Sequence, residues 1–117
     1  HTVYSGLDPE WPATLSERIL TGLLRHELGY SGVIVTDDLE MGAIEREGPI
    51  EEAALRSFVA GADLLLICHD HQKVIKTQQK MARALVAGGI APDRLAQSRA
   101  RIAAVRDRYP VLPPRPS

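Results

Sequence analysis

Two short runs of apolar residues constrain the fold of this chain more than any other feature. They occupy residues 32–36 (Gly-Val-Ile-Val-Thr) and 63–67 (Asp-Leu-Leu-Leu-Ile). Neither run alternates apolar with polar residues, so each predicts a strand covered on both faces, as in a parallel sheet. Residues 50–60 lie between the runs and have helical spacing, with Ala53, Ala54 and Phe58 facing inward. A strand, a helix and a second strand in this order predict a right-handed parallel crossover and an α/β fold.

Three further helices are predicted around this unit. The first begins near Thr14 or Ser16 and ends at Gly29, the second covers about 72–87, and the third covers about 92–109, with Pro92 in its first turn. Residues 39–49 are predicted to be a loop. Because two strands alone make a poor sheet, we expect them to pair with strands outside this sequence or with another copy of the chain.

Composition and charge exclude several classes of protein. Apolar residues make up 44% and charged residues 25%, which is typical of a soluble globular domain. No apolar run approaches the roughly 18 residues that a membrane span needs. Residues 80–117 carry eight Lys+Arg against two Asp+Glu, but Tyr109 is their single aromatic residue. Since bases need aromatic platforms for stacking, we expect a solvated basic helix face and no nucleic-acid partner.

Single residues in these elements have simple structural interpretations. Cys68 lies in an apolar run and is predicted to be a small buried residue. Arg94, Arg101 and Arg108 recur every seven residues and are predicted to lay their stems along the core edge while their charges stay in water. Trp11 is predicted either to line a ligand cleft or to anchor a loop.

The two ends of the chain suggest a piece of a larger domain. The sequence begins at His1 rather than Met, so we expect that the chain was cut, and no signal peptide is recognisable. Residues 110–117 contain four prolines and predict an extended tail, in which residues 113–116 form a weak PxxP pattern. We therefore divide the chain into a domain at 1–109 and a proline-rich tail at 110–117.

Asp37 and Asp38 follow the first predicted strand directly. By themselves they are most simply interpreted as a turn or helix-cap pair. Their context is more specific: residues 23–41 read Leu-Leu-Arg-His-Glu-Leu-Gly-Tyr-Ser-Gly-Val-Ile-Val-Thr-Asp-Asp-Leu-Glu-Met. Residues 7–9 (Leu-Asp-Pro), 12–16 (Pro-Ala-Thr-Leu-Ser) and 60–66 (Ala-Gly-Ala-Asp-Leu-Leu-Leu) flank it. Over about residues 1–105 this pattern resembles glycoside hydrolase family 3, in its bacterial β-N-acetylhexosaminidase branch.

The resemblance implies a fold and a chemistry. The chain would be the C-terminal portion of a (β/α)8 TIM-type barrel, roughly its last two strand–helix units, and incomplete on its own. Asp37 would be the nucleophile of a retaining hydrolase that releases terminal β-linked N-acetylglucosamine without a cofactor. The substrate would be a glycan or muropeptide containing N-acetylglucosamine, in cytoplasmic peptidoglycan recycling. Catalytic groups of such barrels lie at the C-terminal ends of the strands, where Asp37 is predicted to lie.

Other site residues follow less directly. Asp38, Met41 and His69 are predicted to contact substrate. In this branch of the family the acid/base is a histidine paired with an aspartate on an upstream loop, and that motif is absent from this sequence. His69 has a suitable side chain for the role, but nothing in the family assigns it there. His69, Asp70 and His71 are adjacent in the sequence, and no further ligand accompanies them. Adjacent residues alone make a poor metal cage, so we expect no metal.

Three interpretations remain open. The parent protein is a hydrolase that acts through Asp37, and this chain alone is inactive. Alternatively, the chain is a non-catalytic fragment or an oligomeric interaction module, completed by a missing N-terminal half of the barrel or by self-association. A third possibility is a β-N-acetylglucosaminide phosphorylase, which transfers the sugar to phosphate.

Overall fold

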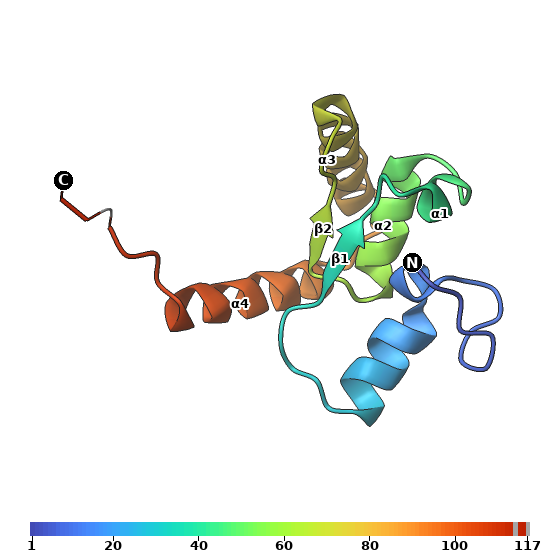
Figure 1. Ribbon diagram of the computed structural model, residues 1–117, viewed down its shortest axis with the longest axis horizontal. Helices are drawn as coiled ribbons and strands as arrows, with labels where there is room; N and C mark the ends of the chain where they lie inside the picture. The colour runs from blue at the N-terminus through green and yellow to red at the C-terminus, as the bar shows by residue number, and fades with distance from the viewer. Residues whose placement is uncertain (114, 117) are drawn as a thin grey trace.

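A computed structural model describes residues 1–113, 115 and 116 of the chain, in which a pair of parallel strands is flanked by helices (Figure 1). Pro114 and Ser117 of the predicted tail lie outside the described residues. No helix in the described part is long and apolar enough to cross a membrane. The elements, in chain order, are η1 (Ala13–Leu15), η2 (Arg18–Glu27), β1 (Val35–Asp38), α1 (Gly42–Glu45), α2 (Ile50–Ala60), β2 (Leu64–Leu66), α3 (His71–Val86) and α4 (Pro92–Arg108).

The predicted strand–helix–strand unit is present. Strands β1 and β2 pair in parallel, with Val35 opposite Leu64 and Asp38 opposite Leu66, and α2 lies between them in the chain. The α/β prediction is therefore confirmed. The predicted position of the first strand was wrong, because β1 begins at Val35 and includes both aspartates. Ile34 lies outside the strand because its N–H donates to the Oδ2 atom of Asp63 (2.9 Å) rather than to a neighbouring strand.

Only one face of the strand pair is covered. Leu65 and Ile67 pack against a core of six buried residues: Leu15, Leu39, Ile44, Ile50, Ala53 and Ala54. On the opposite face Val35, Leu64 and Leu66 are 53%, 42% and 40% exposed. The prediction that both faces are buried is wrong for the described residues. The other face of the strand pair is therefore exposed and mainly apolar. We call it the open face and define it by Val35, Asp37, Leu64 and Leu66.

The first helix differs from its prediction. Its hydrophobic spacing predicted an α-helix, whereas the structure has the short 3₁₀-helix η1 followed by the π-helix η2. At its end the Leu28 N–H donates to the Leu23 carbonyl, five residues back (2.9 Å). Ser16 caps its start as predicted, because its Oγ atom accepts from the Ile19 N–H (3.1 Å). The chain leaves the helix through Gly29, whose φ of 68° is the left-handed value that was expected.

Helix α2 ends where the chain must turn tightly against η2. Gly61 has a φ of 136°, and a Cβ atom there would lie 2.8 Å from the Thr21 Oγ1 atom. Thr21 donates from its hydroxyl to the Ala60 carbonyl (2.7 Å). Glycine is therefore required both for the backbone angle and for the close approach of the two helices.

The buried carboxylate of Asp63 organises the other side of the molecule. Its side chain is fully buried and accepts hydrogen bonds from Arg25 (2.6 Å), Arg101 (3.0 Å) and Ser98 (2.6 Å). Arg94 lies 3.6 Å away and donates to the carbonyls of Phe58, in the last turn of α2, and of Ala62, just after that helix. The prediction that the charges of Arg94 and Arg101 stay in water was wrong, because both guanidinium groups bind this inward-facing carboxylate.

Helix α4 extends away from the rest of the chain (Figure 1). Within α4, Ser98 is buried, whereas Val105 is 43% exposed and Tyr109, just past the end of the helix, is 70% exposed. The predicted helix boundaries are confirmed to within one residue, and residues 103–108 are exposed.

Candidate functional site at the ends of the strands

The proposed nucleophile lies at the end of β1. Asp37 is exposed, whereas Thr36 before it is buried, as expected when successive side chains of a strand point to opposite faces. Its Oδ1 atom accepts from the N–H of Asp38 (2.8 Å). Asp37 therefore shares the open face with Val35, and its carboxylate is accessible to a ligand.

Asp38 faces the neighbouring loop instead. Its Oδ1 atom accepts from the N–H groups of Glu40 (3.0 Å) and Cys68 (3.2 Å), and its Oδ2 atom lies 3.1 Å from Nδ1 of His69. The Glu40 N–H, assisted by Cys68 and His69, outweighs desolvation and holds the pKa of Asp38 below its ordinary value. Asp38 is thus an ionised carboxylate that joins the C-terminal ends of the two strands. Its predicted contact with substrate stays a prediction.

Glu40 is the residue that sequence reasoning missed. Its side chain is only 7% exposed, and its Oε2 and Oε1 atoms accept from the N–H groups of His69 (2.6 Å) and Asp70 (3.1 Å). Lys73, in the first turns of α3, lies 3.5 Å from Oε1. Burial alone would raise the pKa of Glu40, but these two N–H groups and the Lys73 charge lower it below its ordinary value. Its place in the Thr-Asp-Asp-Leu-Glu-Met motif was the available signal.

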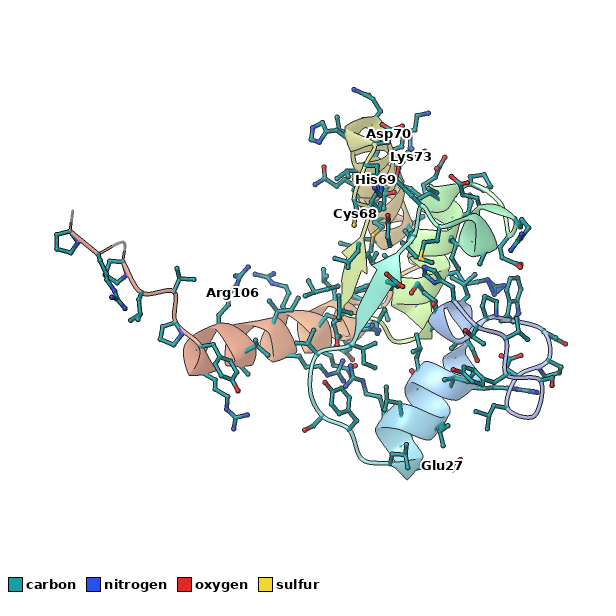
Figure 2. All side chains as sticks on the ribbon, viewed as in Figure 1. Glu27, Cys68, His69, Asp70, Lys73 and Arg106 are labelled. Atoms are coloured by element: carbon teal, nitrogen blue, oxygen red, sulfur yellow. The ribbon has the colours of Figure 1, made fainter. Side chains whose placement is uncertain are left out.

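The loop after β2 brings His69 to the same rim, as predicted. Figure 2 shows Cys68, His69, Asp70 and Lys73 gathered where β2 ends and α3 begins. The imidazole Nδ1 atom of His69 lies 3.1 Å from Asp38 and 3.4 Å from Glu40, yet its side chain is 79% exposed. Cys68 is exposed, so its predicted burial was wrong. The sulfur continues the alternation of the open face beyond Leu66.

Two other residues, His1 and Met41, lie near the rim. His1 bridges two segments, because its Nδ1 atom lies 2.7 Å from Thr14 Oγ1 and its Nε2 atom 2.7 Å from the Asp38 carbonyl oxygen. Met41 directly precedes α1 and is 44% exposed. The structure therefore places Met41 at the rim, without testing its predicted contact with substrate.

Asp38, Glu40 and His69 also form a possible metal-ligand set. Each offers one ligand atom, and these atoms lie within 4.8 Å of one another. The sequence predicted no metal site, and the triplet of His69, Asp70 and His71 considered there is not the set that the fold brings together. Because Asp38 and Glu40 already accept N–H groups from the loop after β2, we assign them to holding that loop in place.

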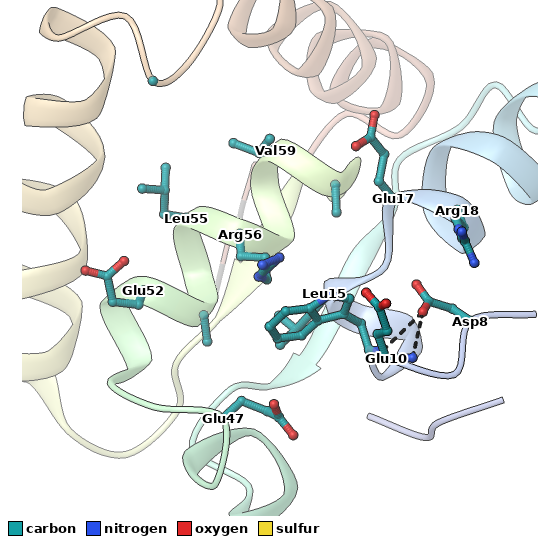
Figure 3. A pocket seen from close by; sticks show the side chains of 14 residues that line it. Asp8, Glu10, Leu15, Glu17, Arg18, Glu47, Glu52, Leu55, Arg56 and Val59 are labelled. Carbon is teal, nitrogen blue, oxygen red and sulfur yellow. Dashed lines mark hydrogen bonds between the residues drawn. The ribbon is translucent and has the colours of Figure 1, made fainter. Parts of the chain in front are cut away.

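A separate hollow of about 500 Å³ lies against α2, lined by residues that include Trp11, Glu52 and Arg56 (Figure 3). The Arg56 guanidinium carbon lies 3.5 Å from the centre of the Trp11 ring. Trp11 also packs against the core, which supports the loop-anchor interpretation. Asp37 does not line this hollow, so the hollow and the rim of the strands are separate sites.

Parallel α/β barrels carry their active sites at the C-terminal ends of the strands, which is where the exposed carboxylate of Asp37 lies. The model of the glycosyl hydrolase family 3 N-terminal domain matches residues 1–105. The chain therefore belongs to glycosyl hydrolase family 3, as the sequence resemblance implied.

Three proteins illustrate the relationship. Beta-hexosaminidase A of Pseudoalteromonas piscicida is 38% identical over 105 residues, covering 85% of this chain and 18% of that protein. The family 3 β-N-acetylglucosaminidase structure from Paenibacillus sp. str. FPU-7 superposes with a TM-score of 0.88 at 38% identity, over 91% of this chain and 20% of the other. The β-N-acetylglucosaminidase structure from Thermotoga maritima gives 0.81 at 29% identity, over 89% and 23%. The chain spans about a fifth of the length of these relatives.

Proposed function

We propose that this chain carries the nucleophile of a β-N-acetylhexosaminidase that acts by retention. The observation that carries the proposal is the position of Asp37 on the open face, where one carboxylate is accessible while its neighbour Asp38 is bound by the protein. The relatives reported above include a protein named beta-hexosaminidase A and two β-N-acetylglucosaminidases, which supports an N-acetylglucosamine-containing glycan as substrate.

The proposed reaction has two displacements. The Asp37 carboxylate attacks the anomeric carbon and forms a glycosyl ester, while the bond to the leaving oxygen breaks and that oxygen takes a proton from an acid. The same group then removes a proton from water, which attacks the anomeric carbon and releases Asp37. The second step restores the starting charge of both groups, and retention follows from two inversions.

The acid/base is expected outside this chain. The family resemblance implies an upstream histidine paired with an aspartate, and we propose that this chain forms the last two strand–helix units of a (β/α)8 barrel. The open face of β1 and β2 supports this proposal, because apolar strand residues that are 40–53% exposed need covering by further strands. The 117-residue chain alone would then be inactive. The cytoplasmic role in peptidoglycan recycling and the alternative transfer to phosphate stay predictions.

The test is the Asp37→Asn variant of the complete protein that contains this chain. We expect kcat for release of para-nitrophenol from its N-acetyl-β-D-glucosaminide to fall by at least about a thousandfold, since an amide cannot form the ester. Asp107→Asn, an exposed change on α4, is the matched control and should leave kcat unchanged. An Asp37→Asn protein with wild-type kcat would exclude Asp37 as the nucleophile.

A further inference from the structure

The ring of His69 is held on one side only. Its Nδ1 atom faces the carboxylates of Asp38 (3.1 Å) and Glu40 (3.4 Å). Both carboxylates have a pKa below the ordinary value, so both are ionised at neutral pH and can only accept hydrogen bonds. A hydrogen on Nδ1 is therefore favoured over a lone pair there, and Nε2 lies on the far side of the ring with its lone pair available as an acceptor.

The loop that carries His69 is anchored at several points. The backbone N–H groups of Cys68, His69 and Asp70 donate to Asp38 or Glu40. Asp70 in turn caps α3 by accepting from the Gln72 N–H (2.8 Å). The backbone of His69 is therefore held in place, while its side chain lies beside two carboxylates and stays 79% exposed.

The other nitrogen of His69 is available for a ligand. Among the residues that the structure describes, no hydrogen bond is made by its Nε2 atom. The loop also adjoins the end of β1, because the Leu39 N–H donates to the Leu66 carbonyl (2.8 Å) and the Cys68 N–H donates to the Asp38 Oδ1 atom (3.2 Å). Nε2 thus stands free at the rim that carries the proposed nucleophile.

We propose that His69 binds the substrate through Nε2, by a hydrogen bond to a hydroxyl group of the bound N-acetylhexosaminide, and that Asp38 and Glu40 are the positioning residues that aim it. This inference rests on the proposed function. The surroundings favour a neutral sugar hydroxyl over an acidic group, because Asp37, Asp38, Glu40 and Asp70 make this rim acidic.

Two amide substitutions separate ligand binding from loop structure. In His69→Asn the amide nitrogen takes the place of Nδ1, so the contact with Asp38 is kept and the polar group at the Nε2 position is lost. In His69→Gln the amide group reaches the Nε2 position, where its oxygen can accept from a hydroxyl as Nε2 does, so the polar contact at the rim is kept and the contact with Asp38 is lost. A role in substrate binding and a role in loop structure therefore predict opposite rankings of the two variants.

The measurement is calorimetric binding of N,N′-diacetylchitobiose to the complete protein carrying Asp37→Asn, which prevents turnover. We expect His69→Asn to raise Kd about tenfold, the effect of losing one hydrogen bond, and His69→Gln to stay within about threefold. His71→Asn, an exposed histidine in the first turn of α3, is the control and should leave Kd unchanged. Thermal melting of each variant checks its folding.

The possible outcomes point in different directions. Equal Kd values for the parent and His69→Asn, or weaker binding by His69→Gln than by His69→Asn, would overturn the role of Nε2 and leave the proposed function intact. Hydrolysis at the wild-type rate by the Asp37→Asn protein would overturn the nucleophile, and the His69 ranking would still decide the sugar contact. Absence of binding by every folded variant would overturn both proposals.

Discussion

At the scale of single residues, Asp63, Asp38 and Asp37 differ in the hydrogen-bond donors that surround their carboxylates. Asp63 is fully buried and is surrounded by three arginines, Asp38 is bound by backbone N–H groups, and Asp37 faces open space. A buried charge is tolerated only when it is paired and hydrogen-bonded, and Asp63 meets both conditions. The residue therefore links η2, α4 and the loop before β1, three segments that are remote in sequence.

Removing the Asp63 carboxylate should be strongly destabilising. Asp63→Ala leaves Arg25 and Arg94 partly buried without their counter-ion, and we expect the free energy of unfolding to fall by about 3–5 kcal/mol. Urea unfolding followed by circular dichroism measures the loss. Asp107→Ala is the control on the exposed end of α4, and an equal effect of the two changes would contradict the role of Asp63.

The same carboxylate makes stability dependent on acid pH. Burial would raise the pKa of Asp63, but Ser98, the Ile34 N–H and Arg101 hold the pKa below its ordinary value. Its stabilising contribution is therefore complete above the unfolded pKa of about 4 and is lost as the pH falls through the folded value. Stability measured from pH 6 downward should decline, and the decline should be shallower in the Asp63→Asn variant; identical slopes would contradict this assignment.

At the scale of elements, the sequence predicted best what depends on local pattern. The helix at Ile50–Ala60, the parallel crossover and the turns at Gly29 and Gly61 follow from spacing and glycine placement. Three features could not be predicted from the local pattern. They are the start of β1, the buried ends of Arg94 and Arg101, and the role of Glu40 in holding the loop after β2. Each depends on a side chain that meets a partner 28 or more positions away, which periodicity cannot reveal.

Gly61 gives a test at the junction of elements. Gly61→Ala combines an unfavourable φ with a Cβ that would lie 2.8 Å from Thr21 Oγ1, whereas Gly88→Ala meets open space at a φ of 82°. We expect Gly88→Ala to cost about 1–2 kcal/mol for the backbone alone and Gly61→Ala to cost about 1–3 kcal/mol more. Thermal unfolding of both variants measures the extra cost at Gly61, which combines the Cβ clash with its less favourable φ of 136°, and equal losses would show that the two helices can move apart.

At the scale of the whole molecule, the described chain exposes surfaces that larger domains cover. The open face and the far half of α4 present apolar residues to solvent, among them Val35, Leu64 and Val105. The relatives reported above are about five times as long as this chain. We therefore expect the isolated chain to have a strong tendency to associate.

Association should depend on the open face. Leu66→Lys places a charge on that face, where Leu66 is 40% exposed, and should shift the isolated chain toward monomer in sedimentation at micromolar concentration. Leu112→Lys, at a residue that is 80% exposed in the tail, is the control and should leave the distribution unchanged. A chain that is monomeric without either change would contradict association through this face.

The alternation of side chains along β1 has a consequence for the pair of adjacent aspartates. Neighbouring positions of a pleated strand point in opposite directions, so a slip of one residue between β1 and β2 would exchange the fates of Asp37 and Asp38. Asp38, whose carboxylate now binds the loop after β2, would become exposed, and Asp37 would take its place against that loop. Strand registration therefore decides which of the two adjacent carboxylates is accessible, and a one-residue insertion or deletion at residues 34–36 would exchange them without replacing either one.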